Sequence, residues 1–194
     1  MTGDSVERWS RLQAELYSLC FRRPSSNQLV VELAGAFAGD VVADIGCGVG
    51  AAVRRAVAGG ADATGVDPSP AMVEIARRRS SRTPGAWFVV GDAADVPLPD
   101  DSMSIVWSIA SFHHWPDGGA GLLEVRRVLR PGGRLLIGER RKRRAGGHGL
   151  TPTEADGVAD LLRSLGYHDV DVGLHRRRLT KLVVVSATNP RVAA

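Results

Sequence analysis

From residue 40 onward, the hydrophobic positions of the chain fall into two alternating patterns. Short continuous apolar runs that end at a glycine, a proline or an acidic residue are typical of buried strands. Between these runs, apolar residues recur at every third or fourth position, which is the pattern of an amphipathic helix. The runs that we expect to form strands are 41–45, 63–66, 87–90, 104–110, 134–139, 168–174 and 181–187. This alternation predicts an α/β fold, in which a doubly wound, mostly parallel sheet of seven strands carries helices on both faces.

Capping residues mark where several of the intervening helices begin. Ser69 is followed by a proline, so a helix is expected to start directly after it. Thr151 and Glu154 stand at the spacing of a capping box, which predicts another helix start. The helices that we expect between the strands are 51–58, a segment from residue 70 onward, 122–129 and 152–165.

The first 38 residues predict two more helices, which would form part of a ligand pocket. Apolar residues recur at three- and four-residue steps over 6–19 and give that segment one apolar face. After a break, Asn27 is expected to cap a second helix that runs to residue 37. We therefore expect a single domain over residues 1–194, with residues 39–188 as its core.

Composition agrees with one globular domain and excludes several other classes. The chain has 194 residues, of which 44% are hydrophobic, so it can bury a sizeable core. No run of about 18 apolar residues exists, so no membrane span is expected. The polar N-terminus has no apolar signal core, and a cytoplasmic protein is the simplest expectation. The two cysteines are too few for a disulfide framework or a zinc site.

The most informative segment is the turn that follows the apolar run 41–45. Asp44 stands two residues before the first of three alternating glycines, Gly46, Gly48 and Gly50. Glycines at a strand-to-helix turn let a ligand approach backbone N–H groups at a positive helix end. The turn also matches the pattern G-x-G-x-x-G/A of dinucleotide-binding proteins, so a nicotinamide cofactor is one interpretation. A carboxylate at position 44 argues against it, because this group would repel a pyrophosphate.

Two more carboxylates follow the next two apolar runs. Asp67 ends the run 63–66 and is placed to accept both hydroxyls of a ribose. Asp92 follows the run 87–90, where an acid can accept the exocyclic amine of adenine. A carboxylate for an amine, one for a ribose and one for an adenine, in that order, describe a site for S-adenosylmethionine.

These motifs resemble those of the class I, seven-stranded S-adenosylmethionine-dependent methyltransferases. The glycine turn and the strand ends at 65–67 and 91–93 are similar to three motifs of that family, and 129–137 resembles a fourth. The segment Phe112–Trp115 contains the His-His-Trp sequence common in its small-molecule branch. The resemblance implies a final antiparallel strand, S-adenosylmethionine as cofactor and S-adenosylhomocysteine as product. The cofactor contacts that it implies are Asp44, Gly46, Cys47, Gly48, Asp67, Pro68, Met72, Asp92, Ala93 and Ser108.

An oxygen or nitrogen acceptor often needs a base, and His113 is the first candidate for this catalytic role. His114, His148 and Tyr17 are weaker candidates. The competing interpretation is that His113 only packs and fixes the turn before Trp115.

Arginine-rich runs at 140–144 and 176–178 are compatible with more than one class of methyl acceptor. Both follow strands whose ends are expected on the ligand side, so an anionic small molecule is favoured. A merely solvated surface is the alternative. A nucleic-acid methyltransferase is another, although the Asn/Asp-Pro-Pro-aromatic run of amine-methylating enzymes is missing after the fourth predicted strand. A non-catalytic protein that binds S-adenosylmethionine is a further possibility. A reductase is disfavoured because the chain has no Tyr-x-x-x-Lys pair.

Overall fold

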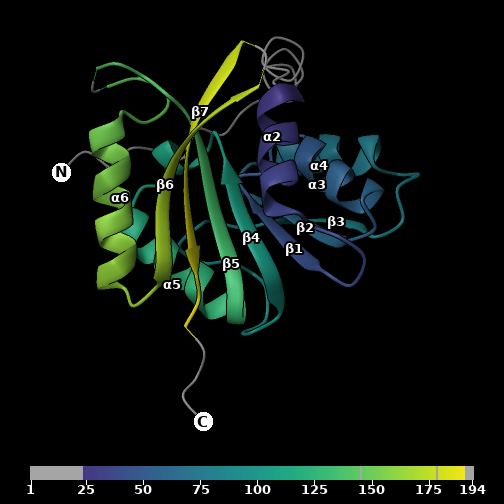
Figure 1. The fold of residues 1–194 in the computed structure, drawn as a ribbon. Coiled ribbons are helices and arrows are strands. Elements are labelled where there is room, and N and C mark those ends of the chain that lie inside the picture. Colours follow the sequence, from purple (N-terminus) through teal and green to yellow (C-terminus); the bar gives the residue numbers. More distant parts are fainter. Residues whose placement is uncertain (1–23, 145, 178, 191–194) are drawn as a thin grey trace, which may run out of the picture.

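The computed structural model describes residues 24–144, 146–177 and 179–190 of the chain (Figure 1). The helix expected over 6–19, including Tyr17, lies outside the described residues. The rest forms one sheet between two layers of helices, as Figure 1 shows.

The sheet has seven strands in the order β3-β2-β1-β4-β5-β7-β6. Neighbouring strands from β3 to β5 are parallel, whereas β7 runs antiparallel to both β5 and β6. The predicted fold class and the antiparallel final strand are therefore confirmed. The strands are β1 Val41–Ile45, β2 Asp62–Asp67, β3 Ala86–Val90, β4 Met103–Ile109, β5 Leu129–Arg140, β6 His168–Arg177 and β7 Thr180–Thr188. The order of the strands reverses between β1 and β4, and ligands of such sheets bind at the carboxyl ends of the strands beside this reversal.

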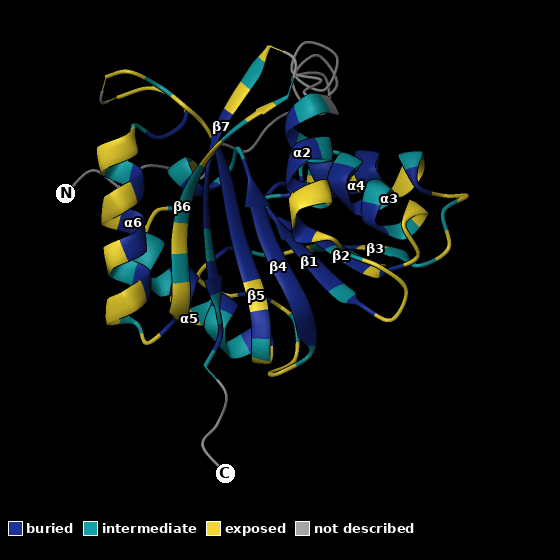
Figure 2. Ribbon diagram, viewed as in Figure 1, coloured by how far each residue is buried: buried dark blue, intermediate teal, exposed yellow. Residues whose placement is uncertain are grey.

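Helices cover both faces of the sheet. The α-helices are α2 Pro24–Ala34, α3 Ala51–Ala58, α4 Pro70–Arg79, α5 Gly118–Val128 and α6 Pro152–Ser164, and a short 3₁₀ helix, η1, spans Phe112–His114. The apolar sides of α2, α3 and α4 pack on one face around Trp107, and those of α5 and α6 pack on the other face around Ile137. Figure 2 shows that the central strands β1, β4 and β5 are mostly buried, whereas β6 at the sheet edge is not.

Two predicted caps are confirmed. The Ser69 hydroxyl accepts a hydrogen bond from the backbone N–H of Met72 and starts α4. Thr151 and Glu154 form the full capping box of α6. Local side-chain chemistry therefore sets the beginning of these two helices.

Several predicted boundaries are wrong. Asn27 does not cap α2, because the helix begins earlier, at Pro24, and ends at Ala34. Helix α5 begins at Gly118 rather than at Leu122, because the Asp117 carboxylate accepts a hydrogen bond from the N–H of Ala120. The proline at the start of α2 and the glycines at the start of α5 interrupt the apolar pattern, so the sequence did not reveal where these helices begin.

Strands β5 and β6 also extend beyond their predicted ends. β5 begins at Leu129 rather than Arg134, because Leu129 pairs with Met103 of β4 across an irregularity in register. β6 runs to Arg177, because it pairs with β7 as far as Thr180. The arginines at 176 and 177 thus lie within β6 rather than after it. In the described parts of the chain, no helix has the length and apolar character needed to cross a membrane.

Candidate functional site

The glycine turn after β1 is held against the end of β2. The backbone N–H groups of Gly46 and Cys47 both donate to the carbonyl of Val66, at 2.8 and 3.0 Å. All three glycines have positive φ, with values of 78°, 52° and 73° at Gly46, Gly48 and Gly50. Side chains rarely adopt this left-handed conformation, so the chain can turn here into α3 only because glycine stands at these positions.

The first two glycines face different surroundings. A Cβ on Gly46 would overlap the side chain of Ser111, which precedes η1. A Cβ on Gly48 would meet no heavy atom within 4 Å. Gly46 therefore lets the segment after β4 pack on the turn, whereas Gly48 borders open space that a ligand can enter.

Asp67, at the end of β2, ties this turn to the start of α4. One of its carboxylate oxygens accepts a hydrogen bond of 2.8 Å from the N–H of Gly48, and the other accepts one of 2.9 Å from the N–H of Ser69. Burial raises the pKa of Asp67, and these two hydrogen bonds oppose the rise. Each oxygen keeps a lone pair, and 8% of the residue remains exposed. A hydroxyl of a ligand can therefore still donate to Asp67.

Asp44 is a buried carboxylate that lies opposite Trp107 in the register of β1 and β4. Burial, and then the charge of nearby Asp67, raises the pKa of Asp44 to about 8. The indole N–H of Trp107 opposes that rise but has no partner of good hydrogen-bond geometry in the described structure. Among the described residues no cationic side chain forms an ion pair with Asp44. The site thus holds an acid that an external cation would complete.

Three other predicted cofactor contacts lie after β3 and in α4. Asp92 follows β3, is half-buried, and uses one oxygen to accept a hydrogen bond of 2.9 Å from the N–H of Ala94. Ala93 is buried in the core beside it. Met72 is buried in α4 and packs with Ile75.

The remaining three differ in how they can meet a ligand. Pro68 is exposed between β2 and α4. Cys47 is buried, and its pKa is raised by burial and by Asp44, so that it stays a thiol. Ser108 is completely buried in β4, and its hydroxyl has no hydrogen-bond partner in the described structure.

His113, the predicted catalytic residue, is held by a residue that sequence reasoning missed. The completely buried carboxylate of Glu139, near the end of β5, lies 2.9 Å from His113 Nδ1 and 3.3 Å from the His113 backbone nitrogen. A carboxylate at this distance can accept a hydrogen bond from Nδ1–H, and in the neutral tautomer that carries its proton there, Nε2 keeps a lone pair. The Nε2 atom lies 3.1 Å from Nδ1 of His148, in the loop after β5. The sequence signal for Glu139 was an acid at the end of a predicted buried strand, as at Asp67.

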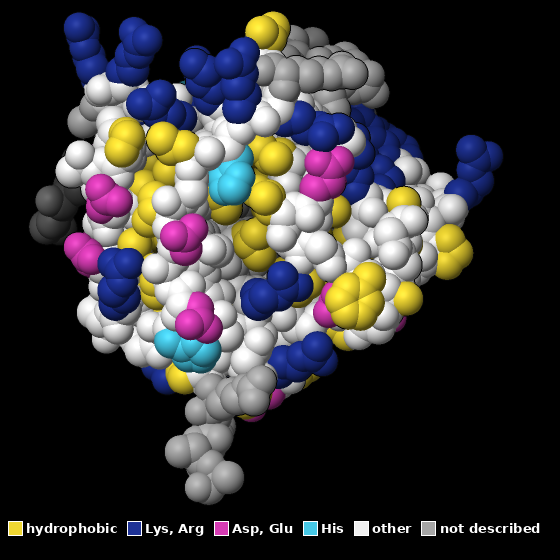
Figure 3. Space-filling model, in the orientation of Figure 1, with side chains coloured by type: hydrophobic (Ala, Val, Ile, Leu, Met, Phe, Trp, Pro, Cys, Tyr) yellow, Lys and Arg dark blue, Asp and Glu magenta, His cyan; other side chains and the backbone are white. Residues whose placement is uncertain are grey.

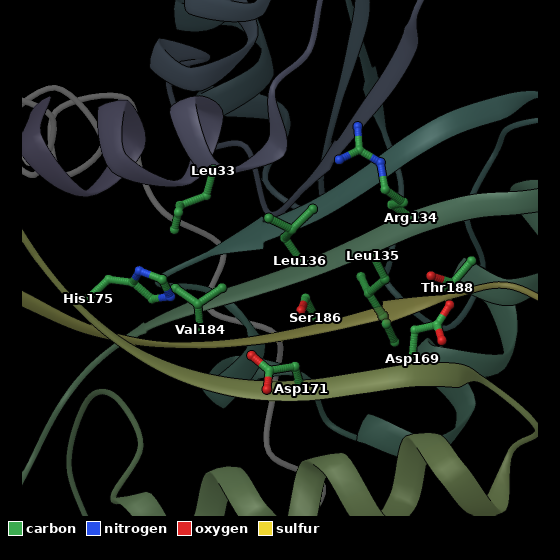
Figure 4. A pocket seen from close by; sticks show the side chains of 11 residues that line it. Leu33, Arg134, Leu135, Leu136, Asp169, Asp171, His175, Val184, Ser186 and Thr188 are labelled. Carbon is green, nitrogen blue, oxygen red and sulfur yellow. The ribbon is translucent and has the colours of Figure 1, made fainter.

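A surface pocket lies away from these residues. Figure 4 shows it between α2 and the strands β5, β7 and β6, with Leu33 of α2 facing Leu136 and Val184. None of the predicted site residues lines it.

Basic side chains gather at the end of the molecule that holds the loop after β5 and the β6–β7 hairpin (Figure 3). β6 runs parallel to β5, since both are antiparallel to β7, so Arg176 and Arg177 lie at the same edge of the sheet as Arg140. Some of this charge is already paired. Arg177 lies 2.9 Å from Glu32, and Lys142 lies 3.2 Å from Glu154.

Comparisons with known proteins agree on one domain type. A family model described as a methyltransferase domain matches residues 43–137. The 27-O-demethylrifamycin SV methyltransferase of Amycolatopsis mediterranei (strain S699) is 39% identical over 122 residues, which are 59% of this chain and 45% of that protein. Demethylmenaquinone methyltransferase of Tropheryma whipplei (strain Twist) is 36% identical over 109 residues, which are 56% of this chain and 45% of that protein.

The fold is also found among solved structures. A SAM-dependent methyltransferase from Aquifex aeolicus has a TM-score of 0.72 at 20% identity, over 93% of this chain and 99% of that one. This likeness concerns the fold. The match to the two curated relatives spans less than half of their length.

Proposed function

The chain belongs to the class I S-adenosylmethionine-dependent methyltransferases, and on this basis we propose that it methylates a small molecule with S-adenosylmethionine as donor. One observation carries the proposal. Asp44 is a buried acid without a cationic partner among the described residues, and it lies at the foot of a turn whose Gly48 faces open space. An amino-acid ammonium would supply the missing charge, whereas a pyrophosphate would add a second negative one.

The residues at the strand ends fit this cofactor group by group. Asp44 would pair with the amine of its methionine part, Asp67 would accept the ribose hydroxyls, and Asp92 would accept the adenine amine. The turn at Gly46 and Gly48 would let the cofactor lie against the backbone. The further contacts that we propose are Cys47, Pro68, Met72, Ala93 and Ser108. Trp107, which lies opposite Asp44, brings a buried indole N–H without a hydrogen-bond partner of good geometry among the described residues, which supports a polar ligand beside Asp44.

When bound, S-adenosylmethionine supplies a methyl group that a sulfonium has already activated. The protein then has to orient an acceptor and exclude water. We assign the acceptor side to His113, because Glu139 contacts its Nδ1 and its Nε2 lies 3.1 Å from the exposed His148, and in the tautomer with the proton on Nδ1 the Nε2 atom carries a lone pair. A lone pair held in this way can accept the proton of a hydroxyl or an amine, or can bind a cation.

A small acceptor is supported by the names of the two relatives, which act on a rifamycin and on a menaquinone precursor. The basic end of the molecule supports an anionic acceptor, since Arg140 directly follows Glu139, the partner of His113, and Arg141, Arg143 and Arg144 are exposed in the loop after β5. Nucleic acid is the second candidate for the methyl acceptor, and these arginines are the feature that favours it. The cytoplasmic location stays a prediction from the sequence.

Transfer of an isotope-labelled methyl group from S-adenosylmethionine to a panel of phenols, alcohols and phosphorylated metabolites tests the proposal. We expect S-adenosylhomocysteine to form with an acceptor of this panel, and its formation to fall in His113→Ala. Tight binding of S-adenosylmethionine without turnover on any acceptor class, RNA and DNA included, would instead support a non-catalytic binding protein.

A further inference from the structure

Three histidines come together where the loops after β4 and β5 meet. His113 and His114 belong to η1, and His148 stands between two glycines in the loop after β5. One ring nitrogen from each lies within 4.8 Å of the others, and the ring centroids are 4.0 to 5.2 Å apart. The structure assigns this cluster as a binding site for a divalent transition-metal ion, with zinc as the reference ion.

The spacing of the nitrogens suits a metal. His113 Nε2 and His148 Nδ1 are 3.1 Å apart. Two imidazole nitrogens bound to zinc at about 2.0–2.1 Å in a tetrahedron lie about 3.3 Å from each other. His148 is exposed on its loop, so its ring would turn to direct a lone pair at an ion that His113 Nε2 also binds.

Glu139 supplies the second, independent observation. Histidines that bind metals almost always donate their other ring N–H to a carboxylate, a carbonyl or a water, which fixes the tautomer and strengthens the ligand. The Glu139 carboxylate does this for His113, at 2.9 Å and without any exposure to solvent. Histidines that cluster only by chance on a surface do not require a buried acid behind one of them. The contact between Glu139 and His113 therefore favours a metal site.

The position of the site suggests its use. Three protein ligands leave at least one coordination position open, as in catalytic rather than structural zinc sites. The segment that carries two of the ligands begins at Ser111, whose side chain packs where Gly46 has no Cβ. The ion would thus lie beside the glycine turn, and its open position can hold an oxygen of the acceptor. This last step rests on the proposed function, whereas metal binding itself does not.

Titration of the metal-free protein with Co²⁺, followed by its visible absorption, and with Zn²⁺ by calorimetry tests the site. We expect one ion per chain, with the intense visible bands of low-coordinate cobalt. His148→Ala, a change on an exposed loop, should weaken binding at least tenfold, and Glu139→Gln should weaken it about 10- to 100-fold, as for other residues behind a metal ligand. The matched control is His168→Ala, because His168 lies at the start of β6, paired only with its neighbour Asp169 in the described structure.

The outcomes separate the site from the proposed function. Equal Zn²⁺ affinity in the wild type, His148→Ala and His168→Ala would overturn the metal site, as would the absence of cobalt bands in the wild type. S-adenosylhomocysteine binding, measured on the same samples, should be unchanged in His148→Ala. If the metal binds as expected and S-adenosylhomocysteine does not bind the wild type, the metal site stands and the proposed function fails.

Discussion

The carboxylate of Asp67 accepts a hydrogen bond of 2.8 Å from the backbone N–H of Gly48. This bond joins the end of β2 to the glycine turn after β1, so two strands that are neighbours in the sheet shape one site. Because Asp67 also accepts from Ser69 at the start of α4, a single side chain fixes both edges of the place where we expect the ribose.

Replacement of Asp67 by alanine should therefore weaken binding of S-adenosylhomocysteine by about 1.5–3 kcal/mol, the range for hydrogen bonds to a charged group. Calorimetry measures the change. The control is Asp62→Ala, because Asp62 is exposed at the opposite end of the same strand. Normal affinity in Asp67→Ala would remove Asp67 from the ribose role.

Asp44 predicts a pH dependence of cofactor binding. Its pKa of about 8 in the free protein means that the carboxyl is protonated at pH 7. A bound ammonium lowers this pKa, so binding releases a proton, and the logarithm of the affinity should rise by nearly one per pH unit between about pH 6 and pH 8. Above that range the affinity should level off. Asp44→Asn should bind more weakly and without this slope.

Asp44 also makes the stability of the free protein depend on pH, but in the opposite direction, because stability falls as pH rises. The folded-state pKa of Asp44 lies above the ordinary aspartate pKa of 3.8, so between these two pKa values the folded state holds a proton that the unfolded chain has lost. The contribution of Asp44 to stability is therefore largest below about pH 4 and is lost as pH rises toward 8. In denaturant unfolding, the free energy of unfolding of Asp44→Asn should rise relative to that of the wild type as the pH increases over this interval. A constant difference between the two proteins would contradict the raised pKa.

Substitution of Gly46 and of Gly48, the first two glycines of the turn, should have different effects. Gly48→Val should abolish S-adenosylhomocysteine binding and destabilise the fold by only about 1–2 kcal/mol, the cost of a left-handed backbone for an L-residue. Gly46→Val should unfold more readily, because its side chain collides with Ser111. Gly157→Ala on α6, where a Cβ meets nothing within 4 Å, should instead stabilise the protein by about 0.5–1 kcal/mol. Binding that survives in Gly48→Val would place the ligand elsewhere.

The arginines after β5 give a charge-based prediction. Arg143→Gln combined with Arg144→Gln should reduce turnover of an anionic acceptor, less so at high salt, and leave S-adenosylhomocysteine affinity unchanged. Arg82→Gln combined with Arg130→Gln removes the same charge from exposed positions elsewhere and should have little effect.

If the acceptor is a nucleic acid, the logarithm of its affinity should fall linearly with the logarithm of the salt concentration, with a slope of about 0.7–0.9 for each phosphate neutralised. An absence of RNA and DNA binding at about 50 mM salt would exclude that acceptor.

Sequence patterns predicted the residues that we assign to the cofactor, because each of them belongs to a local motif near the end of a strand. Asp44 lies one residue before the end of its apolar run, whereas Asp67 and Asp92 follow theirs, and a parallel sheet brings such strand ends to one edge. The antiparallel last strand followed from the family resemblance. Helix starts were right where a serine or threonine caps them, and wrong at α2 and α5, where glycines or a proline interrupt the apolar pattern.

The acceptor side could not be derived in the same way, because its contacts join distant segments. His113 meets Glu139 across 26 positions and His148 across 35. No local pattern in the sequence pairs them, and Glu139 differs from other strand-end acids only in what packs around it. The pairing of β4 with β5 is what places these residues together.

The identity of the cofactor is the central claim, and calorimetric titration of the whole chain at pH 7 tests it most directly. S-adenosylhomocysteine and NAD are titrated in parallel into the wild type and into Asp44→Asn. We predict that S-adenosylhomocysteine binds the wild type at one site with release of a proton, that Asp44→Asn binds it more weakly without that release, and that NAD does not bind. Binding of NAD, or failure of S-adenosylhomocysteine to bind the wild type, would contradict the account.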